Sequence, residues 1–489
     1  MAQNKLYSLM KALRTEELKD VAAYIQKEKP ALMDCFGKLS EMHPDMREAE
    51  GTREALFSAA YKDKPFDDQK MRHLKVQFCR LIEGYLIQAE FAIDNKSKNE
   101  LLIKALAHRN NYRIFKDYAT RRLKELDNLP ERGRDYFLEK AHHFQLMYLH
   151  PGTEQMNEGD IYLKPFVDST EMAYAYTLLE MATEHRLGLR IMQTMPESLS
   201  DENGLQMAAN KSQGHPPLSL FYQLFQLYQN GDGADDLENL FQSLRNYLHQ
   251  MDGMEKRLAV KLLANWPFQL SNQGSERHSR FIFEVFRFAV KNGLLPDLNG
   301  QINPGHFTNV VLSGVKVGEL KWAEKLVEKH AHLLPSETKE VVVDLCLAAI
   351  YFGQGKQKRQ PRYFKKVLNQ LGDSPQRFAE RYNLRYRTTA IRASFELIAL
   401  GEDYMDELDK NIKNFERYLY KNRLLPDDAK QPYFRFMDFT KVLSRVAVAT
   451  DKERQQVMSF FSEIKSDPPV AHQQWLLEKA EELLQSLRH

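Results

Sequence analysis

Basic side chains are concentrated in one part of the sequence, residues 355–395. This segment contains eleven Lys and Arg residues against two acidic ones, a net charge of +9, although the whole chain of 489 residues carries only +2. Lys and Arg bind phosphates and carboxylates, and Arg also stacks on aromatic rings. The residues that we expect to bind an anion or an acidic partner are Lys358, Arg359, Arg362, Lys365, Arg377, Arg381, Arg385 and Arg392.

The arginine spacing in this segment predicts a stripe on a helix. If residues 376–399 are helical, four of the arginines recur at steps of four, four and seven and share one face. One hypothesis is that the stripe binds a polyanion or an acidic partner segment. The favoured hypothesis is that the stripe is solvated or neutralised, because five acidic residues follow within 402–409.

Motifs for catalysis are missing from the sequence. It contains no phosphate-binding loop, no dinucleotide-binding glycine motif after a strand, and no zinc-protease or serine-hydrolase signature. Cys35, Cys79 and Cys346 lie in apolar helical contexts and are interpreted as buried thiols. The sequence therefore predicts a protein that is not an enzyme and that has no cofactor and no bound metal.

The composition and the hydrophobic pattern indicate an all-α fold. Apolar residues make up 43% of the chain, while only 22 Gly and 19 Pro are present, few for a β-sandwich or barrel. Residues 68–90 place apolar side chains at steps of three, four and seven, as on a helix of about six turns. No apolar run has the length of a membrane span or a signal peptide, so we expect a cytoplasmic protein.

Changes of pattern along the chain predict three parts. Residues 1–125 form an N-terminal helical module. Residues 126–295 contain helical hairpins, with long loops expected near 150–170 and 195–217, where periodicity is weak. The second stretch also contains Gly204, Gly214, Pro216 and Pro217. Residues 296–489 contain repeats and C-terminal capping helices.

The unit from Phe307 to Pro335 resembles a tetratricopeptide repeat. Phe307 and Val310 match the large apolar residues of the family's first helix, Gly318 matches the turn, and Ala323 matches the small residue where two helices approach. The resemblance implies α-α hairpin repeats that form a tetratricopeptide-like superhelical solenoid. The residues assigned to repeat packing are Gly318, Trp322, Ala323, Tyr351 and Gly355.

The whole chain is also similar to an uncharacterised bacterial family of helical proteins. The matching stretches are residues 5–9, 16–19, 43–45, 64–68 and 318–335. This family has no assigned function, so the similarity implies one continuous architecture and no activity.

These observations predict a non-catalytic helical-repeat scaffold that binds a protein or peptide partner in its groove, with no membrane partner. The alternative is a nucleic-acid-associated regulator. It would use the basic stripe 355–392, or a helix-turn-helix-like segment over 52–86 that places the helix 68–82 in the major groove.

Overall fold

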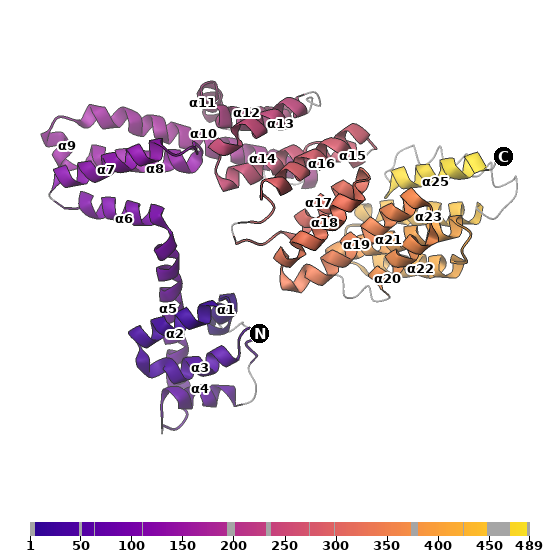
Figure 1. Cartoon of the computed structure of the whole chain (residues 1–489), viewed down its shortest axis with the longest axis horizontal. Coiled ribbons are helices and arrows are strands. Elements are labelled where there is room, and N and C mark those ends of the chain that lie inside the picture. The colour runs from indigo at the N-terminus through magenta and orange to yellow at the C-terminus, as the bar shows by residue number, and fades with distance from the viewer. Residues whose placement is uncertain are drawn as a thin grey trace. The chain divides into compact units, whose positions relative to one another are not determined.

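The fold is entirely helical in the described part of the chain. The computed structural model describes residues 5–47, 51–62, 64–109, 111–192, 201–230, 236–272, 274–297, 299–372, 380–423, 425–446 and 470–486. These residues form 24 α-helices and three short 3-10 helices, without a strand (Figure 1). The all-α prediction is therefore confirmed.

The chain divides into two compact units. Unit 1 comprises Met1–Asn128 and His142–Phe166, and unit 2 comprises Leu129–Ala141 and Val167–His489. In chain order, the first ten described α-helices are α1 (Lys5–Ala12), α2 (Glu17–Glu28), α3 (Met33–Glu41), α4 (Thr52–Ala60), α5 (Asp68–Ile93), α6 (Asn95–Ala107), α7 (Tyr112–Asp127), α8 (Arg134–Leu149), α9 (Pro151–Gln155) and α10 (Gly159–Met192).

Helices α1 to α5 form a bundle with its own hydrophobic core. Helix α5 begins where the Asp67 carboxylate accepts a hydrogen bond from the Lys70 amide, a normal N-cap. The predicted apolar stripe of α5, which includes Met71, Leu74 and Phe78, is buried against the preceding helices. No residue after Tyr85 is among the fully buried members of this core.

The rest of unit 1 packs around a second, smaller core. Ile103 of α6 and Phe115 of α7 are buried there together with Met147 and Tyr162. A polar network adjoins this core. Glu158 accepts hydrogen bonds from the Tyr112 hydroxyl and the Lys116 ammonium, both at 2.6 Å. This network joins α7 to the turn between α9 and α10.

The two long loops expected from the sequence are largely helical. Residues 150–170 contain α9 and the start of α10, so the loop prediction there is wrong. Pro151 occupies the first turn of α9, where it costs no hydrogen bond, and Pro165 lies inside α10. In the second stretch, residues 202–212 form α11, and residues 195–200 lie outside the described residues.

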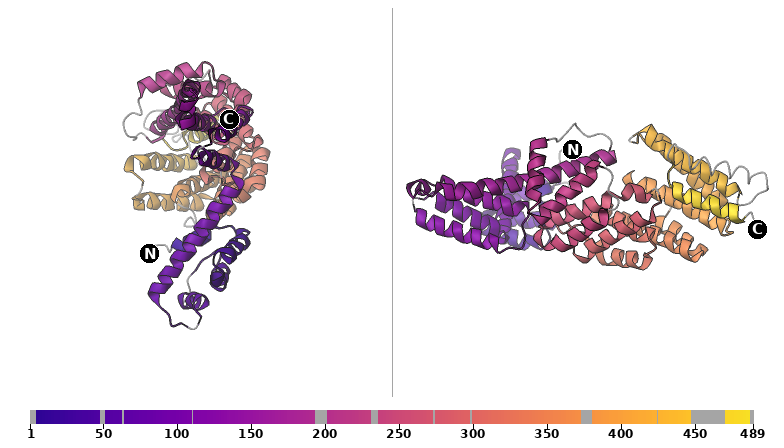
Figure 2. Two further views of the ribbon diagram at one scale, coloured as in Figure 1. Left: turned by 90° about the vertical axis from the view of Figure 1, so that its left-hand side faces the viewer. Right: turned by 90° about the horizontal axis from the view of Figure 1, so that it is seen from above.

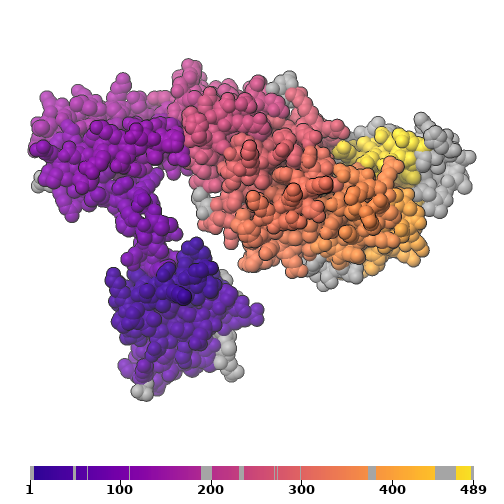
Figure 3. Space-filling view, viewed as in Figure 1, coloured from indigo at the N-terminus to yellow at the C-terminus, as the bar shows by residue number. Residues whose placement is uncertain are grey.

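Unit 2 contains one continuous core that extends from Ala175 to Ala480. Its main contacts join each helix to the next or the next but one in chain order, as the gradual change of colour in Figures 2 and 3 shows. Its further helices are α11 (Glu202–Ser212), α12 (Pro216–Asn230), α13 (Leu237–Tyr247), α14 (Gly253–Asn265), α15 (Phe268–Asn272), α16 (Glu276–Lys291), α17 (Pro304–Lys316), α18 (Leu320–His330), α19 (Ser336–Lys358), α20 (Pro361–Leu371), α21 (Glu380–Ala399), α22 (Met405–Lys421), α23 (Asp427–Val446) and α25 (Gln473–Ser486).

Glycines allow close approach where the sequence resembles a helical repeat. Gly318 has φ +84°, a left-handed conformation that ends α17 and leads into α18. Gly314 faces Trp322 so closely that a Cβ would lie 2.8 Å from the indole, and a Cβ on Gly355 would lie 2.6 Å from the Phe364 ring. Two residues assigned to repeat packing, Trp322 and Gly355, thus lie at close approaches between neighbouring helices, α17 with α18 and α19 with α20.

Candidate functional site

The basic residues of the segment 355–395 do not form one exposed stripe. Arg392 packs inward, with its guanidinium carbon 4.3 Å from the centroid of the Phe352 ring and 5.7 Å from that of Trp475. Burial lowers the pKa of Arg392 to about 10 and also lowers the pKa of Arg385. The interpretation of an exposed stripe therefore does not hold for these two arginines.

Other members of the segment are neutralised or lie outside the described residues. Lys365 forms a 2.8 Å ion pair with Glu402, the first acidic residue of the run expected to neutralise the stripe. Lys356 pairs with Glu478 at 2.7 Å. Arg377 lies outside the described residues, as does the side chain of Arg381.

Four cations remain exposed at the turn between α19 and α20. We call Lys358, Arg359, Arg362 and Lys366 the α19–α20 basic patch. Arg359 adopts φ +48° and ends α19, and α20 begins two residues later at a proline. Lys358 Nζ donates to the Tyr363 hydroxyl at 2.7 Å, and an Arg362 Nη donates to the same oxygen at 3.1 Å.

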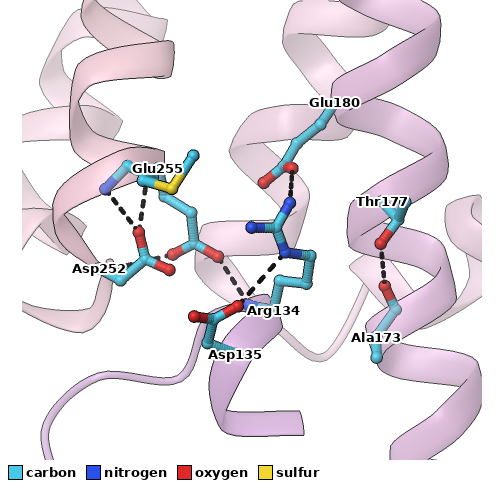
Figure 4. Close-up of polar contacts among 8 residues, drawn as sticks. Arg134, Asp135, Ala173, Thr177, Glu180, Asp252 and Glu255 are labelled. Carbon is cyan, nitrogen blue, oxygen red and sulfur yellow. Dashed lines mark hydrogen bonds and ion pairs between the residues drawn. The ribbon is translucent and has the colours of Figure 1, made fainter. Parts of the chain in front are cut away.

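Unit 2 also contains a buried carboxylate cluster that the sequence analysis missed (Figure 4). Arg134 of α8 pairs with Glu180 of α10 at 2.7 Å, and its backbone amide donates to Glu255 of α14, also at 2.7 Å. Glu255 further accepts the Asp252 amide at 3.0 Å in a capping box. Gly133 leaves room for this carboxylate, because a Cβ there would lie 2.1 Å from it.

Both buried carboxyls of this cluster hold their protons more tightly than usual. Desolvation raises the pKa of Glu180 to about 7, although Arg134 opposes the shift. Desolvation and the neighbouring Asp252 raise the pKa of Glu255 to about 7 as well. The capping-box spacing of Asp252 and Glu255 was a local signal that could have been found, but the approach of Glu180 depends on tertiary structure.

A serine and a lysine also lie within hydrogen-bonding distance, an arrangement that can activate a nucleophile. Lys316 Nζ lies 2.9 Å from Ser271 Oγ and 2.6 Å from the Ser271 carbonyl oxygen. Ser271 is buried, and its hydroxyl also contacts Ser279 at 2.8 Å. Because the hydroxyl is covered, the contacts described here link α17 to α15 and present no nucleophile at the surface.

Three basic residues of the helix-turn-helix-like segment make internal contacts. Arg53 of α4 and Arg72 of α5 both pair with Asp68, and Lys75 lies over the Tyr7 ring at 5.2 Å. The expected recognition helix continues to Ile93, and the first part of it packs into the N-terminal core.

The described residues contain no group of three His, Cys, Asp or Glu side chains arranged to hold a metal ion. The three cysteines are free and buried, as predicted, and burial raises the pKa of Cys35 and Cys346 to about 12. Within the described ranges, no helix has the length and apolar character needed to cross a bilayer. Comparison of the chain with protein-family models, curated proteins and solved structures finds no match.

Proposed function

We propose that the protein is a helical scaffold, with a tetratricopeptide-like arrangement of hairpins in its C-terminal part, that binds a partner protein. The proposal is supported by the serial packing of the helices in unit 2 and by the use of its buried polar groups to join helices. It extends the function expected from the sequence.

The observation that carries this proposal is an uncovered apolar surface on α5 and α6. Leu101 is 54% exposed and Leu102 is 45% exposed, whereas the next residue, Ile103, is buried in the core, so both leucines lie on the outer side of α6. Lys98, on the same outer face, places its Nζ 6.0 Å from the centroid of the exposed Phe91 ring of α5. Neighbouring exposed apolar side chains of this kind mark interaction surfaces.

The occupant that fits this surface is the apolar face of a partner helix. Leu101 and Leu102 are consecutive and point about 100° apart, so together they form a broad apolar side of α6 against which a second helix can pack its own apolar ridge. Charged residues of both signs lie near the two leucines in the sequence, since Glu90, Asp94 and Glu100 accompany the three lysines of α6. A mixed rim around an apolar centre is typical of protein interfaces.

Site-specific photo-crosslinking tests the proposal. A photoreactive residue at Leu101, in the full chain and in the native cell, should capture one protein that the same residue at Val76 does not. Val76 is a matched control, since it is 48% exposed on α5 but lies in the N-terminal bundle. With the captured protein purified, Leu101→Asp should weaken binding at least about tenfold, and Val76→Asp should not.

The proposal fails if Leu101 captures nothing, or if Leu101→Asp and Val76→Asp weaken binding equally. The nucleic-acid alternative is favoured only by the α19–α20 basic patch, since Arg385 and Arg392 pack inward. It predicts oligonucleotide binding that weakens steeply between ~50 and ~200 mM salt.

A further inference from the structure

The α19–α20 basic patch concentrates positive charge around one phenol. Lys358 and Arg362 both donate to the Tyr363 hydroxyl, and Lys366 Nζ lies 5.9 Å from the centroid of the same ring. The hydroxyl is a neutral acceptor, so it orders the two cations without balancing their charge. The hydrogen bonds from Lys358 and Arg362, together with the charges of these two residues, lower the pKa of Tyr363.

The chain neutralises two basic residues close to the patch members in sequence, Lys356 and Lys365, but not Lys358, Arg359 or Arg362. Lys356 and Lys365 have carboxylate partners at 2.7 Å and 2.8 Å. Among the described residues, no ion pair reaches Lys358, Arg359 or Arg362. An anion brought by another molecule would relieve the repulsion between the patch cations.

The arrangement favours a protein anion over a nucleic acid. Proteins that bind single-stranded nucleic acids combine cations with exposed aromatic rings on which bases stack. Here the Tyr363 ring is buried, and the charged ends of Lys358 and Arg362 lie 4.7 Å and 4.9 Å from its centroid. The guanidinium fork of Arg362 instead matches carboxylate and phosphate oxygens.

We infer that the α19–α20 basic patch binds an anionic segment of the partner protein, in which clustered carboxylates or a phosphorylated side chain contact Lys358 and Arg362. This inference rests on the proposed scaffold function and adds the chemistry of the partner. Carboxylate and phosphate share the anionic oxygens that the patch requires, and they differ in charge density.

Fluorescence anisotropy on the full chain tests the inference with four labelled probes: a glutamate-rich peptide, a phosphoserine peptide, a glutamine-rich peptide of the same length, and a single-stranded oligonucleotide. The patch variant is Lys358→Gln with Arg362→Gln. The control variant, Lys325→Gln with Lys329→Gln, removes the same charge from exposed lysines of α18. Tyr363→Phe removes the shared acceptor and keeps every cation.

We expect one or both anionic peptides to bind and the glutamine peptide not to bind. The patch variant should lose at least about tenfold in affinity, while the α18 control and Tyr363→Phe stay within about twofold. The stronger of the two anionic peptides identifies the source of the anionic oxygens. Circular dichroism should show unchanged helix content in the patch variant and in the α18 control, because the substituted cations are exposed.

The inference is overturned if the glutamate, phosphoserine and glutamine peptides bind equally, or if the α18 control loses as much affinity as the patch variant. Tighter, patch-dependent binding of the oligonucleotide would assign the patch to nucleic acid instead. If the anionic peptides fail while Leu101 still captures a partner, the scaffold function stands without this site. If the peptides bind and Leu101 captures nothing, the scaffold proposal fails.

Discussion

At the scale of single residues, the polar groups best placed for chemistry are used to join helices. Glu255 accepts backbone amides at the starts of both α8 and α14, and Glu180 pairs with Arg134. Each carboxyl is almost fully buried, so its ionised form loses hydration that the surrounding contacts replace only in part. The cluster therefore links the stability of unit 2 to protonation near neutral pH.

The cluster predicts a specific pH dependence for Glu180. Its pKa is raised from 4.5 to about 7 in the folded state, so its contribution to stability is fully present below pH 4.5 and is lost as pH rises towards 7. The free energy of unfolding of the wild type, relative to Glu180→Gln, should fall by about 3 kcal/mol over that range. Urea unfolding at several pH values measures this difference.

The comparison with a variant is needed because buried histidines act in the opposite direction. Burial lowers the pKa of His215 to about 4, so its contribution is lost as pH falls below 6.5. Glu184→Gln, on the exposed side of α10, is the control and should give a curve parallel to that of the wild type. A Glu180→Gln curve parallel to the wild type would contradict the prediction.

The residue scale also shows what the sequence could predict about the candidate site. It located the basic residues and the acidic run that neutralises Lys365, because these are neighbours in the chain. It could not predict that Arg392 turns inward, since Trp475 and Phe352 come from helices distant in sequence. Helical spacing defines a shared face, and only tertiary packing decides whether that face meets solvent.

At the scale of elements, helical periodicity was sufficient for most of the fold. Residues 68–90 were predicted as a helix and correspond to α5. The failure at 150–170 came from weak apolar periodicity, because that stretch nevertheless forms α9, with a proline in its first turn, and the start of α10. Periodicity could not predict where helix α25 packs, because its position depends on a buried ion pair with α21.

Helix α25 is held to α21 by Glu396. Its carboxylate pairs with Lys479 at 2.8 Å and accepts a hydrogen bond from the Trp475 indole at 2.9 Å. Lys479→Met should destabilise unit 2 by about 3–5 kcal/mol, because it leaves the buried carboxylate without its cation. Adding Glu396→Gln should restore most of the loss in urea unfolding. Equal destabilisation of the single and double variants would show that packing, and not charge pairing, holds α25.

At the scale of the whole molecule, the apolar side chains are divided among separate hydrophobic cores, and the sequence alone does not show this division. The N-terminal bundle buries its apolar residues among α1 to α5. The core of unit 2 instead passes from helix to helix as far as α25. Stability in such serial packing depends on contacts between neighbours.

A fragment ending at Pro335 tests this division with an internal control. It removes α19, whose Val342 and Cys346 are buried in the same core as Leu326 and Val327 of α18. The thermal transition of unit 2 should fall by at least about 5 °C relative to the full chain, because new apolar surface is exposed. Scanning calorimetry should find the transition of the N-terminal bundle unchanged. An unaltered unit 2 transition would contradict the prediction.

The distance in sequence between Glu396 and Lys479 has a consequence for the order of folding during synthesis. The N-terminal bundle has all its core residues once Tyr85 has left the ribosome. Glu396, in contrast, has no ion-pair partner until Lys479, 83 residues later in the chain, has been synthesised. This takes roughly 4 to 17 seconds at ordinary rates of translation. During this time the nascent chain has α21 but not α25, so the core of unit 2 is complete only after α25 has been synthesised.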